Sequence, residues 1–190
     1  MYKFLRNTHL FLGIAAFLFL LMYGLSAVQM AHDNWFSMKP AVSESRVSIP
    51  AEIGSGPRAV ADYLRHAALR GELRDVRSSP SGASFDIARP GAIYRVEYAE
   101  ATRQARIRTY TATFMAVLNR IHHIGGLWHD FWPVNAWGFF VGLVSVALIV
   151  IGATGIYLWL KLRAERAIGV VLLAVNLTVC VTLLVLIRTA

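Results

Sequence analysis

The stretch LFLGIAAFLFLLMYGLSAVQM, at residues 10–30, determines the fold class of this chain. This stretch is long enough to cross a membrane, because a helix needs about 20 residues to span a hydrocarbon core about 30 Å thick. Residues 137–160 and 167–187 form two more runs of this kind. None of the three contains Asp, Glu, Lys or Arg, each of which costs about 2.5–3.5 kcal/mol at the bilayer centre. The sequence therefore predicts an α-helical membrane protein with three transmembrane helices in the lipid bilayer.

The composition agrees with this interpretation. Apolar residues make up 56% of the chain, and the mean hydropathy is +0.51. The first run is longer than the apolar core of a signal peptide and is followed by no cleavage pattern, so we expect an uncleaved anchor. The single cysteine, Cys180, excludes a disulfide within the chain. The net charge of +8 is spread over both flanks of the runs and does not indicate nucleic-acid binding.

The positions of Lys and Arg predict the orientation of the chain. The N-terminal tail, residues 1–9, holds no acid, and its basic residues are Lys3 and Arg6. The loop at residues 161–166 holds three basic residues and one acid: Lys161, Arg163, Arg166 and Glu165. Three crossings put the tail and the loop on the same side, and the positive-inside rule makes that side cytoplasmic. Residues 31–136 and the C-terminal residues 188–190 are then expected on the outer side.

Residues 31–136 are predicted to form a small α+β domain. Residues 40–57 are rich in Ser, Pro and Gly and are expected to be a connector, with a short strand at residues 46–49. A helix is predicted at residues 59–70. Alternating side chains then predict strands, at residues 72–78, 83–89, 92–99 and 105–111. We expect the helix to pack on a three-stranded antiparallel meander.

Five of the six histidines lie near membrane boundaries, and they carry the chemistry that the sequence offers. His32 and His122 are predicted on the same side, where two neutral imidazoles could hold a b-type haem iron. His122 lies in a predicted interfacial segment, residues 115–136. His9 has no histidine partner on the cytoplasmic side, so it either pairs across a dimer or another subunit, or has no metal role. Alternatively, the histidines belong to the belt of aromatic side chains that anchors helices at the headgroups.

Small and polar residues in the membrane runs predict helix packing. Gly138 and Gly142 form a GxxxG pair, which lets a second helix approach closely. Asn176 is a polar group in lipid and is expected to face a helix rather than acyl chains. The partner of these faces lies either in this chain or in another one.

Four short strings resemble the PepSY-associated transmembrane helix family. They are Arg6-Asn7-Thr8-His9, Ala31-His32-Asp33-Asn34-Trp35, Leu118-Asn119-Arg120-Ile121-His122 and Thr154-Gly155. The resemblance covers nearly the whole chain and implies a PepSY-like periplasmic domain, with the first three strings supplying the functional histidines. Larger relatives include di-haem ferrisiderophore reductases of the bacterial inner membrane. The resemblance therefore implies a redox role and that location.

Two functions follow as hypotheses. In the first, the protein binds a b-type haem and transfers electrons, in periplasmic ferric reduction or in respiration. In the second, it is a non-catalytic accessory or assembly subunit of a respiratory or transport complex, bound to other membrane subunits or to a second copy. No catalytic residue is predicted, because the sequence holds no Ser-His-Asp set, phosphate-binding glycine loop, paired acids or cysteine metal motif.

Overall fold

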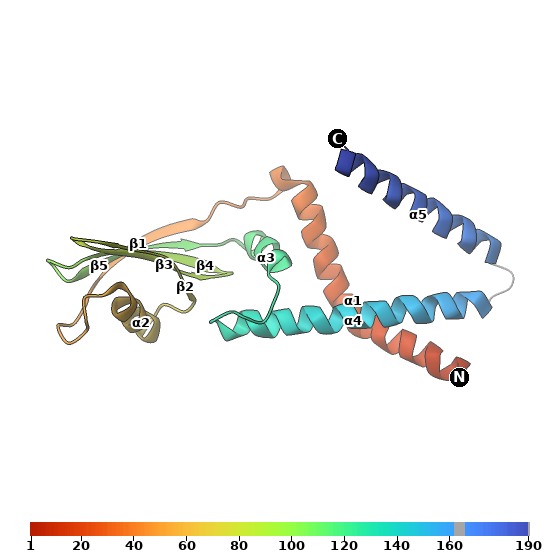
Figure 1. Ribbon diagram of the computed structural model, residues 1–190, viewed down its shortest axis with the longest axis horizontal. Coiled ribbons are helices and arrows are strands. Elements are labelled where there is room, and N and C mark those ends of the chain that lie inside the picture. Colours follow the sequence, from red (N-terminus) through yellow and green to blue (C-terminus); the bar gives the residue numbers. More distant parts are fainter. Residues whose placement is uncertain (162–165, 190) are drawn as a thin grey trace. The chain divides into compact units, whose positions relative to one another are not determined.

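The computed structural model describes residues 1–161 and 166–189. Arg163 and Glu165 of the expected cytoplasmic loop lie outside the described residues. The elements follow one another along the chain (Figure 1) as α1 (Tyr2–Ala31), η1 (Asp33–Trp35), β1 (Ala41–Ser48), α2 (Pro57–Ala67), β2 (Glu72–Ser79), β3 (Gly82–Arg89), β4 (Ala92–Ala99), β5 (Gln104–Thr111), α3 (Phe114–His123), α4 (Trp132–Lys161) and α5 (Arg166–Thr189).

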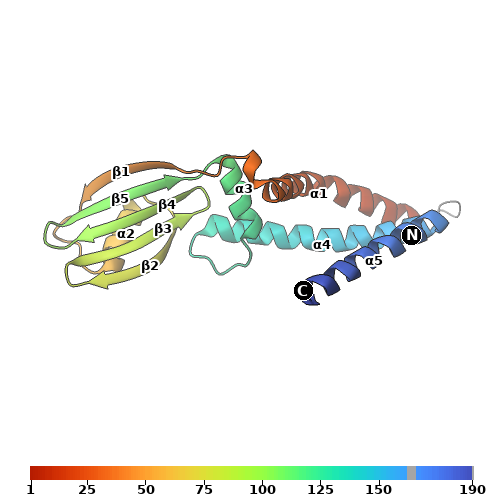
Figure 2. The same ribbon diagram turned by 90° about the horizontal axis from the view of Figure 1, so that it is seen from above.

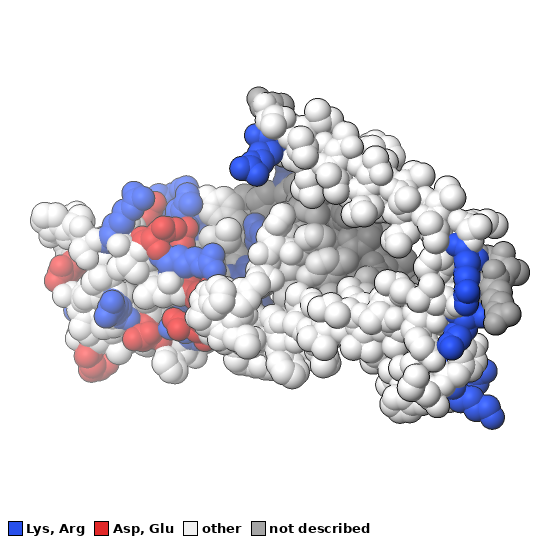
Figure 3. Space-filling model, turned by 45° about the vertical axis from the view of Figure 1, so that its right-hand side comes forward, with Lys and Arg blue, Asp and Glu red and all other residues white. Residues whose placement is uncertain are grey.

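Three helices are long and apolar enough to cross a membrane. They are α1, α4 and α5, with mean hydropathies of 2.2, 2.5 and 2.9 in their most apolar windows. Both α1 and α4 have 30 residues, about 45 Å at 1.5 Å per residue. Each therefore extends beyond a hydrocarbon core of about 30 Å into the headgroup layers. In Figure 3, charged side chains gather over the sheet, whereas the middle of the helical surface in view carries none.

The chain between α1 and α4 contains a five-stranded antiparallel sheet in the order β1-β5-β4-β3-β2. The strands β2 to β5 form consecutive hairpins, and β1 pairs with β5 from Ala41 opposite Thr111 to Ser48 opposite Gln104. The sheet is thus larger than the expected three-stranded meander. The sequence predicts mostly connector here, with a short strand at residues 46–49, because residues 40–57 are rich in Ser, Pro and Gly. In the structure all eight residues of β1 form a strand, and its side chains, except that of Val47, are exposed. An edge strand of this kind lacks the apolar alternation that identifies buried strands.

The helix α2 packs on one face of the sheet, as Figure 2 shows. It begins at Pro57, whose fixed φ and missing N–H suit the first helical position. Its Val60, Ala61 and Leu64 are buried against the sheet, together with alternate side chains of the central strands. Phe85 and Ile87 of β3 also point into this core, so they share one face of the sheet.

The chain divides into two compact units, each with its own site residues. One unit consists of Met1–Leu18 and Leu143–Ala190, and the other is Phe19–Gly142. The first unit holds the beginning of α1, most of α4 and the whole of α5. The second holds the end of α1, the sheet with α2, the helix α3 and the beginning of α4. His9 belongs to the first unit, and His32 and His122 belong to the second.

Candidate ligand site at the membrane-boundary histidines

His122, near the end of α3, is held by Ser26 of α1. Its Nδ1 lies 2.7 Å from Ser26 Oγ, and Ser26 Oγ lies 2.8 Å from the carbonyl oxygen of Tyr23. The carbonyl can only accept, so both contacts are hydrogen bonds only if the hydroxyl proton goes to Tyr23 and the ring Nδ1–H donates to the hydroxyl. In the neutral ring, this arrangement places the free lone pair on Nε2. It is the arrangement in which a histidine binds a metal through Nε2.

An aromatic stack begins beside this histidine within the second unit. The ring of Tyr23 lies 4.5 Å from that of His122, between centroids. Phe19 stacks on Tyr23 at 4.9 Å and on Trp137 at 5.2 Å. Trp137 donates from Nε1 to the carbonyl oxygen of Ile121 at 2.9 Å, which ties the beginning of α4 to α3. The stacked rings and this hydrogen bond join parts of α1, α3 and α4, and the ring of Tyr23 covers one side of His122.

His32 has a different environment at the end of α1. Its side chain is exposed, and its ring stacks on Trp35 at a centroid distance of 4.1 Å and an interplanar angle of 8°. The rings of His32 and His122 therefore have different neighbours, and no hydrogen bond to a described residue orients the ring of His32. The structure does not bring the two predicted haem ligands into contact. Stacking on an exposed tryptophan is also what an interfacial anchor would show.

His9, in the first unit, is held in the same way as His122. Its Nδ1 lies 3.0 Å from Thr154 Oγ1 and 3.1 Å from the carbonyl oxygen of Ile151. Thr154 Oγ1 donates to the carbonyl oxygen of Val150 at 2.7 Å, so the ring Nδ1–H is again the donor and Nε2 carries the lone pair. A Cβ on Gly155 would lie 3.2 Å from His9 Cε1. Glycine thus lets α4 approach the imidazole closely.

The residues predicted to pack helices lie in three different environments. A Cβ at Gly138 would collide with the backbone of Gly126, so this glycine makes room for the chain between α3 and α4. A Cβ at Gly142 would meet nothing within 4 Å. Asn176 is exposed on α5, where its side-chain oxygen accepts a bond from Cys180 Sγ at 3.4 Å. No described residue of α5 is buried, so a partner for Asn176 stays a prediction.

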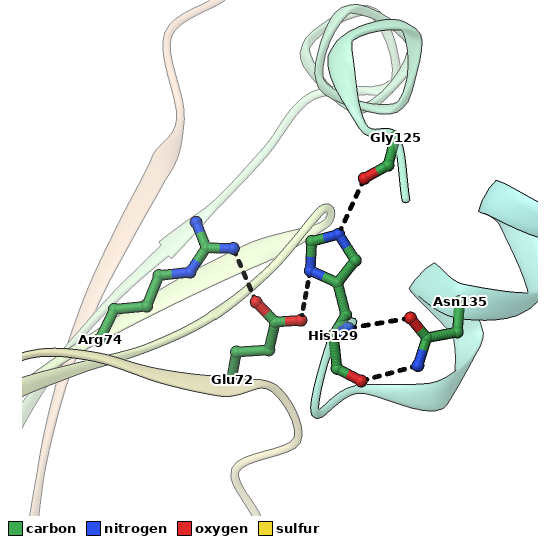
Figure 4. A network of polar contacts seen from close by, with 5 residues as sticks. All are labelled: Glu72, Arg74, Gly125, His129 and Asn135. Carbon is green, nitrogen blue, oxygen red and sulfur yellow. Dashed lines mark hydrogen bonds and ion pairs between the residues drawn. The ribbon is translucent and has the colours of Figure 1, made fainter. Parts of the chain in front are cut away.

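A second polar network joins the sheet to the chain before α4 (Figure 4). His129 Nδ1 lies 2.8 Å from Glu72 Oε1, and Arg74 donates to Glu72 Oε2 at 2.7 Å. The other ring nitrogen of His129, Nε2, lies 3.3 Å from the carbonyl oxygen of Gly125. The Asn135 side chain binds the backbone of His129 twice, at 2.9 and 2.7 Å. The network therefore fixes both the backbone and the ring of this histidine.

The charges in this network are compatible with an ion pair. Burial alone would raise the pKa of Glu72, but the hydrogen bond from Arg74 and the nearby charges of His129 and Arg74 outweigh it, so this pKa is lowered. Carboxylate and carbonyl oxygens, which only accept, face the two ring nitrogens of His129. Only the imidazolium form can donate from both nitrogens. Glu72 and His129 then form a salt bridge, and both side chains are largely buried, with 12% and 15% of their surface exposed.

Comparison with known proteins places the chain in a family. A family model described as "Putative PepSY_TM-like" matches residues 1–188. The chain belongs to this PepSY_TM-like family. No curated protein and no solved structure matches it. Membership and the three long apolar helices make the chain a multi-pass membrane protein.

Two of the four strings that resemble this family contact each other in the structure. His9 of the first string meets Thr154 of the last one, and Gly155 makes room for the ring. Sequence reasoning missed Ser26 as the partner of His122, and it missed the network of Glu72, Arg74 and His129. The available signal for Ser26 was a hydroxyl within an apolar run. Within residues 1–161 and 166–189, no group of three or more His, Cys, Asp or Glu side chains is placed to hold a metal ion.

Proposed function

We propose that this PepSY_TM-like protein binds a b-type haem and transfers electrons, in periplasmic ferric reduction or in respiration. His122 would bind the haem iron through Nε2, and His32 would be the second histidine that binds it. The observation that carries the proposal is the hydrogen bond from His122 Nδ1–H to Ser26, which leaves Nε2 to bind iron. When bound, the haem supplies one-electron redox chemistry at its iron.

The residues around His122 have separate tasks in this proposal. Ser26 orients the imidazole and keeps the proton on Nδ1. The ring of Tyr23, on which Phe19 stacks, would shield one side of the ligand, and shielding from solvent is one means by which proteins adjust the potential of haem. His9 has the same hydrogen-bond pattern, so it would serve a second site that a histidine of another chain completes.

The proposed location is a bacterial inner membrane, with the sheet domain in the periplasm. Support comes from the basic residues at the start of α1 and at the two ends of the connection between α4 and α5: Lys3, Arg6, Lys161 and Arg166. The positive-inside rule places such residues in the cytoplasm. A cysteine introduced at exposed Ser45 of β1, in a chain carrying Cys180→Ser, should react with a membrane-impermeant thiol reagent in spheroplasts. Labelling only after lysis would place the domain in the cytoplasm instead.

An optical spectrum tests the haem. The full chain, purified in detergent from haem-replete cells, should show the sharp α band of a reduced b-type haem. We expect His122→Ala and His32→Ala to lose the band, and Ser26→Ala to weaken haem retention. His66→Ala is the matched control, because His66 is exposed on α2, where its ring binds the carbonyl oxygen of Asp62. A colourless preparation that also fails to bind added haemin would refute the proposal.

A second candidate function, an accessory subunit, is favoured by α5. This helix has no buried residue among those described, and its polar Asn176 is exposed within an apolar run. A buried amide in lipid is costly without a partner, so another membrane helix would bind this face. Cys180 lies one turn after Asn176 on the same face, so oxidation of membranes tests for a second copy there. Recovery of the free monomer alone, after both oxidation and mild-detergent purification, would exclude this function.

A further inference from the structure

A pocket of about 340 Å³ lies between the sheet, the end of α3 and the beginning of α4, all within the second unit. This volume is at the lower end of the range of about 300–1,000 Å³ for small-molecule sites. The charged and polar side chains that line it include Glu72, Arg74, Arg89, Asn119, Arg120 and His129. The pocket thus combines three guanidinium groups with a single carboxylate.

The carboxylate is already engaged by two partners. Glu72 lies 2.7 Å from Arg74 and 2.8 Å from His129. Among the residues that the structure describes, the other two guanidinium groups have only neutral partners. Arg120 donates to the carbonyl oxygen of Pro90 at 3.0 Å, and Arg89 donates to the hydroxyl of Tyr94 at 3.1 Å. The positive charges of Arg89 and Arg120 are therefore not balanced by an acid that lines the pocket.

The pocket also contains a neutral hydrogen-bond donor, Asn119. Asn119 is half-buried on α3, and its side chain makes no hydrogen bond to the residues that the structure describes. Its amide and the two guanidinium groups present many N–H donors to the same space. Oxyanions satisfy such donors best, since each anionic oxygen accepts several charge-assisted hydrogen bonds.

The position of the pocket at the beginning of α4 indicates which oxyanion lies near it. Val134, in the first turn of this membrane helix, lines the pocket. Trp128 and Trp132, which precede it along the chain, are 81% and 74% exposed. Exposed tryptophans at the end of a membrane helix lie at the headgroup level. Phosphate groups are concentrated at this level of a bilayer.

We propose that this pocket binds a phosphate group, with Arg89 and Arg120 as charged donors and Asn119 as a neutral donor. The phosphate belongs either to a phospholipid headgroup or to a soluble phosphate. Glu72 and His129 form one wall, and their ion pair keeps the carboxylate from competing for Arg89 and Arg120. The site is independent of the proposed haem, since neither His32 nor His122 lines it.

Calorimetric titration of the full chain, delipidated in a phosphate-free non-ionic detergent, tests the site. The probes are inorganic phosphate, a short-chain phosphatidylglycerol and a short-chain diacylglycerol that lacks phosphate. We expect binding of at least one phosphate-containing probe and none of the diacylglycerol. Binding of inorganic phosphate alone identifies a soluble ligand, and binding of the phospholipid alone identifies a lipid site. The proposal is overturned if neither phosphate-containing probe binds, or if the diacylglycerol binds as tightly as the phospholipid.

Variants distinguish this pocket from general surface charge. We expect Arg89→Gln with Arg120→Gln to weaken binding about tenfold or more, because two charge-assisted contacts are lost. Asn119→Asp keeps the size of the side chain and adds a negative charge, so it should also weaken binding. Arg58→Gln is the matched control, since Arg58 is exposed on α2 outside the pocket. Circular dichroism checks that each variant folds.

Two results with the variants would overturn the proposal. One is wild-type affinity in folded Asn119→Asp protein. The other is an equal loss of affinity in Arg58→Gln and in the double arginine variant. If the double variant does not fold, Asn119→Asp decides alone.

Discussion

Replacement of Glu72 by Gln should loosen the connection between the sheet and the beginning of α4. The substitution keeps the size of the side chain and removes its charge. Glu44→Gln provides the matched control, because Glu44 also binds an arginine closely: its oxygens lie 2.6 and 2.9 Å from Arg106. The two carboxylates differ in burial, since 12% of the Glu72 side chain is exposed and 36% of the Glu44 side chain.

The magnitude follows from this difference in burial. Hydrogen bonds to charged groups contribute about 1.5–3 kcal/mol. The contact of Glu72 with His129 is an ion pair at 2.8 Å whose orientation falls short of a well-formed hydrogen bond, so this range is its upper bound. Arg74 is 56% exposed, so solvent screens its contact with Glu72 to about 0–1 kcal/mol. The substituted amide could still accept one bond, so we expect a loss of about 1–3 kcal/mol. Glu44→Gln should have no measurable effect.

The effect should depend on pH with a definite sign. The pKa of Glu72 is lowered in the folded state, with burial opposing the change and Arg74 and His129 outweighing it. A carboxylate of this kind stabilises the fold fully above its unfolded pKa of about 4.3 and loses that contribution as the pH falls through the lower, folded pKa. Wild-type protein and Glu72→Gln should therefore differ most near neutral pH and converge in acid.

Hydrogen exchange measures this difference locally. The full chain in detergent is exchanged at several pH values, and the free energy of opening is compared for β2 and for residues 124–131. We expect faster exchange of both segments in Glu72→Gln and unchanged exchange in Glu44→Gln. Equal effects of the two substitutions, or a difference for Glu72→Gln that persists undiminished in acid, would contradict the reasoning.

Three further substitutions test the core, a turn and the histidine contact. Phe85→Ala, at a side chain that is 1% exposed, should destabilise the sheet domain by about 3–5 kcal/mol in urea unfolding, whereas Val42→Ala on the exposed edge should not. Gly82→Ala should lower the thermal midpoint, because φ is +155° and a Cβ would collide with the backbone of Tyr98; an unchanged midpoint would contradict that geometry. Ser26→Ala should cost about 1 kcal/mol and change the ¹⁵N shifts of the His122 ring, whereas Ser26→Thr should retain the wild-type shifts.

The strands of the sheet domain show which elements a local sequence pattern can predict. Strands β3 and β4 alternate buried side chains with half-buried or exposed ones, so the alternation in their sequences predicted them well. Strand β1 is almost wholly exposed, and only its pairing with β5 makes it a strand. Pairing of this kind depends on a segment far away in the chain, and no periodicity within β1 reports it.

The sequence indicated some features of the candidate sites, and only the structure showed the others. Residue type and position near a membrane boundary indicated His9, His32 and His122. The proton positions on His9 and His122 followed only from Thr154 and Ser26, which reach these two rings from other helices. The sequence analysis did not single out His129, although this histidine meets a buried carboxylate.

The sequence by itself determined that three segments lie in lipid. Insertion depends on the composition of one continuous stretch, since a helix satisfies its own backbone and only its side chains meet the bilayer. The tertiary structure alone decided the full length of β1 and its pairing with β5, the hydrogen bond of His122 to Ser26 and the ion pair of Glu72 with His129. Each of these contacts joins residues from distant parts of the chain. Packing brings such residues together, and no local sequence pattern predicts the contact.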